Sequence, residues 1–272
     1  MNSMKNILHA AEKSGTVKRL VFTQAGAGLV NSEDGDTLGN RMERILDGKK
    51  LALSESPRHL LTSSEHVQVN QASLSFTPPM KSAHNAYCAS KAQCMTYLNN
   101  LRLSKDTPYS IVQIIPGTVI GPSEFATTTS KAVAHMDRQT KALIFDEMRP
   151  RYAFGFVHVE DCAKVHIEAL DEKNMKSEDL PPWFVAAGTV GEGIDGPELW
   201  KKAAEMIERE FKKEVEAGVF KVGRTKVPIN MLYRVDSRLT EKMLLDGQRI
   251  RGLEESVREV AHWYVGLKSV ES

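Results

Sequence analysis

Tyr87 and Lys91 are the residues whose types and spacing best suit a chemical step in this chain. Four positions apart on a helix, the two side chains would project from the same face. A lysine ammonium close to a phenol favours the phenolate and lowers the phenol pKa from about 10 towards the range of a general acid or base. The pair therefore predicts proton transfer, although Tyr-x-x-x-Lys also arises by chance on helices of ordinary composition.

The segments around this pair have the pattern of an α/β protein. Residues 17–23 and 109–115 are short apolar runs typical of buried strands, and residues 154–158 form a third such run. A proline-glycine loop, residues 116–122, follows the second run directly. Residues 159–170 carry apolar positions at helical spacing and predict a helix.

Taken in order, these segments resemble the extended short-chain dehydrogenase/reductase proteins of the NAD-dependent epimerase/dehydratase superfamily. The similarity is greatest to their dihydroflavonol-reductase and cinnamoyl-CoA-reductase-like branch. The matching segments are residues 4–11, 17–23, 87–91 (Tyr-Cys-Ala-Ser-Lys), 115–122 (Ile-Pro-Gly-Thr-Val-Ile-Gly-Pro), 156–161 (Phe-Val-His-Val-Glu-Asp) and the closing helices. The resemblance implies an α/β fold with an incomplete Rossmann-like parallel sheet, helices on both faces and a small C-terminal substrate lobe. Residues 1–180 would form a partial NAD(P)-binding domain and residues 181–272 most of the substrate lobe, with some interleaving.

The resemblance also implies roles for particular residues. Tyr87 would give a proton to a substrate carbonyl, and Lys91 would partner Tyr87 and the ribose hydroxyls of the nicotinamide. The backbone expected to lie against the nicotinamide end is that of Pro116, Gly117, Thr118 and Val119. The implied cofactor is NADP, or else NAD, and the implied substrate is a small aldehyde or ketone.

Two features of the chain depart from the family pattern. The family has a Thr-Ser-Ser sequence after the first of these strands, whereas this chain has Thr23-Gln24-Ala25, so a methyl group stands where a serine would polarise the carbonyl. Loss of one such donor typically costs about 10²-fold to 10³-fold in rate. Thr23 or a hydroxyl from residues 62–64 could take its place. The family's glycine-rich phosphate turn would lie ahead of Met1, so we expect either a truncated enzyme or a shortened relative that binds dinucleotide weakly.

Two glycine clusters could be taken for that phosphate turn. Residues 26–31 follow a predicted strand, but no amphipathic helix pattern comes after them. Residues 191–196 match Gly-x-Gly-x-x-Gly, yet Glu192, Asp195 and Glu198 would place negative charge where a pyrophosphate should sit. The resemblance places the second cluster in the substrate lobe instead.

Three functions remain open from the sequence. The first is an NAD(P)-dependent oxidoreductase that reduces an aldehyde or ketone, and the second is a sugar-nucleotide epimerase or dehydratase that uses the same tyrosine and lysine. The third is a non-catalytic relative that binds a ligand or partner, which Ala25 favours.

Composition excludes several other classes. The chain has 272 residues with 36 Lys and Arg against 35 Asp and Glu, which offers no electrostatic case for nucleic acid or a membrane surface. It shows neither a membrane-spanning run nor a signal peptide, so a cytoplasmic protein is expected. No metal site is expected from His158, Cys162 and His166, because the first lies outside the predicted helix. A homo-oligomer or another partner is the expected cover for an exposed sheet edge.

Overall fold

The structure is a computed structural model, and it describes residues 2–29, 45–47, 79–80, 82–104, 106–147, 154–171, 180–190, 196–227 and 234–271. The described strands are β1 (Arg19–Thr23), β2 (Ile45–Asp47), β3 (Ser110–Pro116), β4 (Thr118–Ile120), β5 (Phe156–His158), β6 (Phe184–Ala186) and β7 (Arg234–Asp236). The helices of the first half are α1 (Asn2–Ser14), the 3₁₀ turn η1 (Gly26–Gly28) and α3 (Ala83–Ser104). Those that follow are α4 (Thr129–His135), α5 (Arg138–Ile144), α6 (Val159–Glu168), α7 (Gly196–Glu210), α8 (Lys212–Glu216), α9 (Arg238–Leu244) and α10 (Leu253–Glu271).

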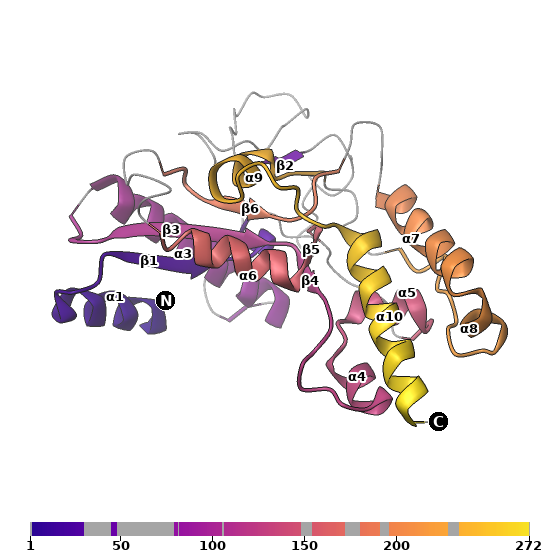
Figure 1. The fold of residues 1–272 in the computed structure, drawn as a ribbon. Coiled ribbons are helices and arrows are strands. Elements are labelled where there is room, and N and C mark those ends of the chain that lie inside the picture. The colour runs from indigo at the N-terminus through magenta and orange to yellow at the C-terminus, as the bar shows by residue number, and fades with distance from the viewer. Residues whose placement is uncertain are drawn as a thin grey trace, which may run out of the picture.

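A parallel sheet of three described strands, in the order β1-β3-β6, forms the centre of the α/β part of the molecule. Thr23 of β1 is in register with Ile114 of β3, and Ile114 pairs in turn with Phe184 of β6. Two further parallel pairs, β4-β5 and β2-β7, lie at the side that leads to the C-terminal helices (Figure 1). The predicted α/β fold with a parallel sheet is therefore confirmed.

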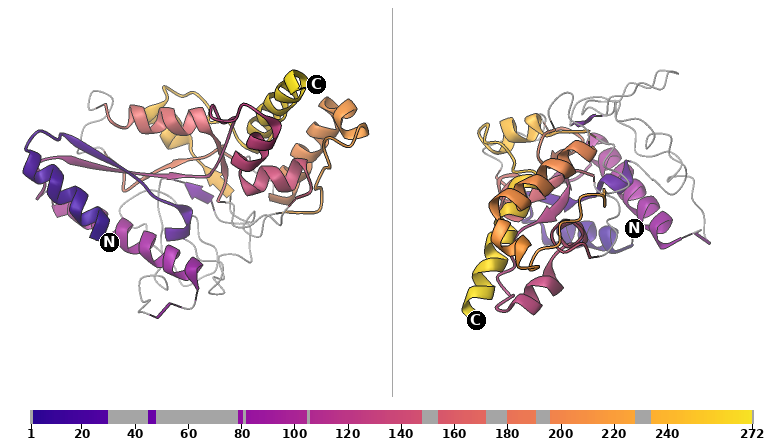
Figure 2. Two further views of the ribbon diagram at one scale, coloured as in Figure 1. Left: turned by 90° about the horizontal axis from the view of Figure 1, so that it is seen from below. Right: turned by 90° about the vertical axis from the view of Figure 1, so that its right-hand side faces the viewer.

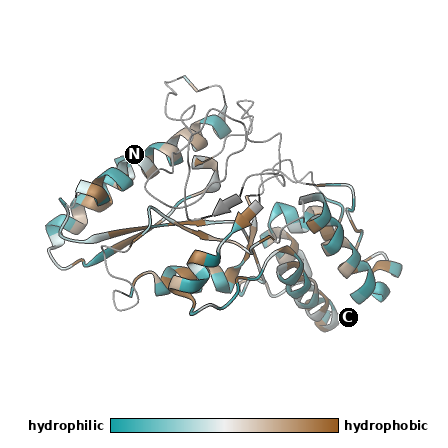
Figure 3. Cartoon of the chain, turned by 90° about the horizontal axis from the view of Figure 1, so that it is seen from above, coloured by the Kyte–Doolittle hydropathy of each residue, from teal (hydrophilic) through white to brown (hydrophobic). Residues whose placement is uncertain are grey.

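Helices cover both faces of this sheet. Helices α1 and α3 lie on one face and α6 lies on the other (Figure 2). Alternation along β3 explains this arrangement, because Ile111 packs in the cluster with α1 and α3 while Val112 and Ile114 pack in the cluster with α6. In Figure 3 brown predominates in the central strands, as expected for strands that are buried on both faces.

A second apolar core joins the C-terminal helices α4, α5, α7 and α10, with Trp200 fully buried in it. The chain ends on α10, at the opposite end of the molecule from α1 (Figure 1). Residues 184–186 complete the first sheet, and residues 129–144 pack in the C-terminal core, so the two predicted halves interleave. A domain boundary near residue 180 stays a prediction.

Ile45–Asp47 is strand β2, which pairs in parallel with β7. Residues 62–64, whose hydroxyls could replace the missing serine, lie outside the described residues. None of the helices that the structure describes combines the length and the apolar composition needed to cross a bilayer.

Candidate active site

Tyr87 and Lys91 both lie on α3, as the sequence predicts. The Lys91 ammonium donates a hydrogen bond of 3.1 Å to the carbonyl oxygen of Thr23, the last residue of β1. The same nitrogen lies 5.9 Å from the centre of the Tyr87 ring. The pair is therefore fixed at the carboxyl end of β1, the end of a parallel strand where ligands bind in open α/β sheets.

The pKa values of the two side chains are shifted in directions that differ from the sequence prediction. Partial burial raises the pKa of Tyr87, and the negative charge available to Cys88 adds to that rise. Burial also lowers the pKa of Lys91. The expected lowering of the phenol pKa is therefore wrong for the described protein, because burial of the phenol raises its pKa. Tyr87 is held in the protonated form in which a proton donor must begin.

The proline-glycine loop lies at the carboxyl end of β3, the strand next to β1. Pro116 is the last residue of β3, and the Gly117 amide donates to the carbonyl of Ala186 over 2.9 Å. Thr118 donates to the carbonyl of Gly155 over 2.9 Å, which starts the pairing of β4 with β5. Lys91 and this loop thus occupy the same edge of two paired strands. That Tyr87 and the backbone of Val119 bind one cofactor stays a prediction.

Ala25, the residue at the predicted serine position, follows β1 and precedes the 3₁₀ turn η1. Its backbone is extended, with φ −148° and ψ 146°, and its carbonyl accepts a bond from the Gly28 amide. Gly28 packs against α3 so closely that a Cβ there would lie 2.6 Å from the Met95 sulfur. Gly28 thus brings the 3₁₀ turn that follows Ala25 against the helix that carries Tyr87, whereas a Cβ at Gly26 would lie 2.7 Å from Phe154. Residues 30–31 and 191–195 lie outside the described residues.

The Thr23 hydroxyl is committed elsewhere. It lies 2.9 Å from Nε2 of His166, which comes from α6 on the opposite face of the sheet from α3. The Nδ1 atom of His166 donates to the carbonyl of Cys162 over 2.7 Å, which fixes the ring with Nε2 towards Thr23. The Thr23 hydroxyl therefore bonds on the α6 side of the sheet, away from the helix that carries Tyr87. The sequence pattern gave no sign of this contact.

The remaining polar residues near this edge have structural partners. Gln24 and Gln113 form an amide pair of 2.9 Å between β1 and β3, and Gln113 also donates to the carbonyl of Pro182. A glutamine directly after β1 and another within the apolar strand β3 were the only sequence signal for this buried link. His158 is fully buried, and its Nδ1 atom accepts from the Glu160 amide at the start of α6.

One group of described residues brings possible metal ligands together. Atoms of His158, Glu160 and Glu259 lie within 4.8 Å of one another. Arg251 already donates to Glu160 over 2.8 Å and to Glu259 over 3.1 Å. Because the guanidinium supplies the positive charge that these carboxylates need, the group is explained as an ion-pair cluster.

Comparison with known proteins finds a partial match to one family model and two kinds of distant relative. Residues 51–180 match the model of the NAD dependent epimerase/dehydratase family. The NAD-dependent epimerase/dehydratase ALT6 of Alternaria alternata is 24% identical over 257 residues, which is 93% of this chain and 65% of that protein. Ketoreductase CTB6 of Cercospora nicotianae is 23% identical over 265 residues, 96% of this chain and 64% of that protein. The chain thus spans somewhat less than two thirds of the length of these relatives.

Solved structures agree on the fold. The yeast methylglyoxal/isovaleraldehyde reductase Gre2, complexed with NADPH, matches with a TM-score of 0.56 at 16% identity, over 98% of this chain and 70% of that chain. Gre2 from Candida albicans matches with a TM-score of 0.56 at 17% identity, over 97% of this chain and 70% of that chain. Residues 51–180 are therefore similar to the NAD dependent epimerase/dehydratase family that the sequence motifs predict, and the fold of the chain is similar to that of these reductases. The narrower dihydroflavonol-reductase-like branch stays a prediction.

Proposed function

We propose that this chain is the part of an NAD(P)-dependent oxidoreductase that places a proton donor beside a small aldehyde or ketone. The observation that carries the proposal is the position of Lys91, whose ammonium is anchored on Thr23 at the carboxyl end of β1 and lies beside the Tyr87 ring. The nicotinamide, when bound, supplies the hydride to the carbonyl carbon. NADPH is the cofactor that we favour, with NADH as the alternative.

The residues present fit the nicotinamide end of such a cofactor. An ammonium has three donor N–H groups, and the bond to Thr23 uses one of them, so Lys91 can also hold ribose hydroxyls. Tyr87 is 47% exposed, so its hydroxyl can reach a bound carbonyl oxygen and give it the proton. The raised pKa of Tyr87 keeps that proton in place at neutral pH. The backbone of the loop from Pro116 to Val119 would complete this end of the site.

Ala25 supports a second proposal, a relative that binds the cofactor or a ligand without turning a substrate over. A methyl group cannot donate to the carbonyl oxygen, and the nearby hydroxyl of Thr23 is bonded to His166. A sugar-nucleotide epimerase or dehydratase is the remaining alternative, and it rests on the name of the matched family. Among the described strands, β1 pairs with β3 on one side alone. Its other side is where a second copy or another partner would add strands.

The test combines cofactor binding with single-residue variants. Purified chain is titrated with NADPH and with NADH by nicotinamide fluorescence, and a panel of aldehydes and ketones is followed by loss of the reduced cofactor. Tyr87→Phe should lower kcat by about 10²-fold to 10⁴-fold while leaving cofactor affinity nearly unchanged. Lys91→Met should weaken cofactor binding as well as kcat. Tyr97→Phe, on the same helix and 36% exposed, is the matched control and should leave both unchanged.

The pH dependence tests the state of Tyr87, and turnover separates the two main proposals. Because the pKa of Tyr87 is raised, the wild-type chain should lose the phenol proton only above the usual tyrosine range, seen as a phenolate absorbance change that Tyr87→Phe removes. Cofactor binding without turnover would favour the non-catalytic relative. Failure to bind either cofactor at millimolar concentration would refute the oxidoreductase proposal for this chain.

A further inference from the structure

A pocket of about 410 Å³ lies between the start of α10, helix α7, strand β5 and the segment that follows β6. This volume is in the range of pockets that hold small organic ligands. Neither Tyr87 nor Lys91 lines it, and the Gly155 backbone in its wall packs against Gly117 of the proline-glycine loop. The pocket is therefore a separate site beside the candidate active site.

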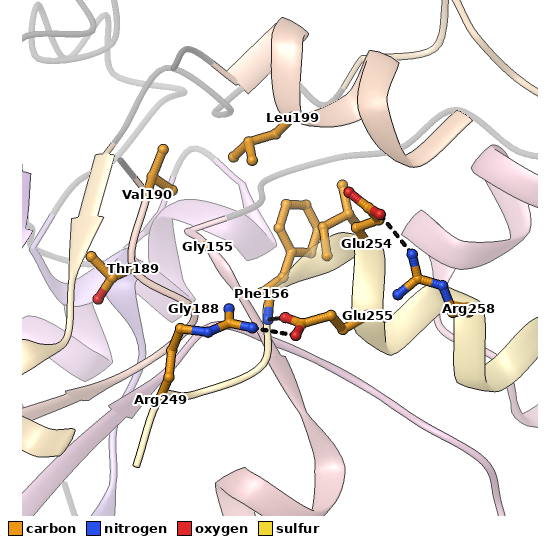
Figure 4. Close-up of a pocket in the computed structure, with 12 residues that line it drawn as sticks. Gly155, Phe156, Gly188, Thr189, Val190, Leu199, Arg249, Glu254, Glu255 and Arg258 are labelled. Atoms are coloured by element: carbon orange, nitrogen blue, oxygen red, sulfur yellow. Dashed lines mark hydrogen bonds and ion pairs between the residues drawn. The ribbon is translucent and has the colours of Figure 1, made fainter. Parts of the chain in front are cut away.

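The pocket has one apolar side and one charged side. Phe156, Val190 and Leu199 give it carbon-rich walls, and Figure 4 shows Leu199 facing the ring of Phe156. The charged side carries two ion pairs from the first turns of α10 and the loop before it, which Figure 4 marks with dashed lines. Those pairs are Arg249 with Glu255 and Arg258 with Glu254.

Each charge in the wall already has a partner of opposite sign. Arg258 donates to Glu254 over 2.7 Å and to Glu210 over 2.7 Å and 3.3 Å. Glu255 binds Arg249 through one oxygen and accepts from the Gly252 amide over 3.2 Å through the other. The pKa values of both arginines are raised by these hydrogen bonds, so the guanidinium groups stay charged.

This pairing decides which ligands the wall can accept. An anion beside either arginine also meets the carboxylate that this arginine binds, and a cation beside either glutamate also meets its arginine, so neither charge gains a full counter-ion in this wall. A hydroxyl both donates and accepts, and each carboxylate has about four lone-pair directions, so hydroxyls can bond to the ion pairs without separating them. An uncharged ring with several hydroxyls and an apolar face therefore suits both sides of the pocket.

We propose that this pocket binds a neutral polyhydroxylated ring, such as the pyranose of a glycoside. The apolar face of the ring lies against Leu199 and Phe156, and its hydroxyls bond to the two ion pairs. Three matched probes test the charge argument: methyl glucoside, which is neutral, glucuronate, which is anionic, and glucosamine, which is cationic. Binding is measured by saturation-transfer NMR and by calorimetry on the full chain.

The wild-type chain should bind methyl glucoside at least about tenfold more tightly than either charged probe, since breaking a charge-assisted hydrogen bond costs about 1.5–3 kcal/mol. Leu199→Trp should fill the pocket and abolish binding while leaving the far-ultraviolet circular dichroism and the NADPH titration unchanged. Those two readouts also keep this result separate from the outcome for the proposed function.

Glu255→Gln gives the sharpest test. Glutamine can still bond to the Gly252 amide at the start of α10, so the helix is retained, but Arg249 loses its carboxylate. The preference should then shift towards glucuronate by about tenfold. Glu205→Gln, which alters an exposed ion pair with Lys201 on α7, is the matched control and should change nothing. The proposal is overturned if glucuronate binds the wild-type chain as tightly as methyl glucoside. It is equally overturned if no probe binds at millimolar concentration, or if Leu199→Trp leaves binding unchanged.

Discussion

Gly117→Ala tests whether the glycine of the loop is needed for strand packing, in addition to any approach of a cofactor. A Cβ at Gly117 would lie 2.7 Å from the carbonyl carbon of Gly155 and 2.8 Å from its oxygen and from the Phe156 nitrogen. These are backbone atoms, so they cannot move away by changing a rotamer. The substitution must push β4 and β5 apart where Thr118 bonds to Gly155. The packing of Gly117 against the backbone of Gly155 and Phe156 therefore constrains the loop sequence, apart from any cofactor.

The size of the effect follows from two contributions. Overpacking of this kind typically costs about 1–3 kcal/mol, and weakening the Thr118–Gly155 hydrogen bond adds about 1 kcal/mol. We therefore expect Gly117→Ala to lower the free energy of unfolding by about 2–4 kcal/mol, and to lower Tm by roughly 5–15 °C. Gly266→Ala is the matched control, because a Cβ there meets no atom within 4 Å inside α10. It should stabilise the chain by about 1 kcal/mol.

Thermal and urea unfolding of the wild type and both variants, followed by circular dichroism, measure these differences. NADPH binding is measured at a temperature where all three remain folded. If Gly117→Ala unfolds like the wild type, the contact with Gly155 does not constrain this loop and the packing argument is wrong. If it loses stability and still binds NADPH normally, the glycine serves packing alone.

Two further predictions concern the hydroxyl that Ala25 lacks and the carboxylate of Asp161. Ala25→Ser should raise kcat by up to about 10²-fold to 10³-fold without changing cofactor affinity, because the extended backbone there accepts serine; a gain that persists when Tyr87→Phe is added would contradict this reasoning. Burial raises the pKa of Asp161, but the hydrogen bonds from Arg251 lower it by more, so the net pKa lies below its usual value. The contribution of Asp161 to stability is therefore present above about pH 4 and is lost as pH falls further. Asp161→Asn should therefore cost about 2 kcal/mol at neutral pH and progressively less in acid, and an equal loss at all pH values would refute this cause.

Sequence patterns predicted the elements that depend on neighbours along the chain. The apolar runs gave β1 and β3, and the helical spacing after residue 158 gave α6, because each pattern reports directly on which face is buried. Tyr87 and Lys91 lie on one helix as predicted for the same reason. The order of these segments indicated the family whose model matches residues 51–180.

Contacts between distant segments could not be predicted in this way. Thr23 and His166 are 143 positions apart, and nothing in either segment indicates the other. The same holds for Gly117 and Gly155, whose close approach depends on how β4 pairs with β5. The direction of the Tyr87 pKa was predicted wrongly because it is set first by burial of the phenol, which the spacing of Tyr87 and Lys91 does not report.

Because Lys91 is bonded to Thr23, a bound cofactor would also have to lower the phenol pKa of Tyr87 in an active protein. With Lys91 bonded to Thr23 and lying beside the ring, burial controls the phenol pKa and the proton stays on Tyr87. Ribose hydroxyls that bond to Lys91 would not remove its positive charge, but they would fix that charge relative to the phenol and exclude water, which strengthens electrostatic interactions. The phenol pKa should then fall only in the complex. Cofactor binding and activation of the proton donor would thus be one event, and the chain alone would keep its donor protonated.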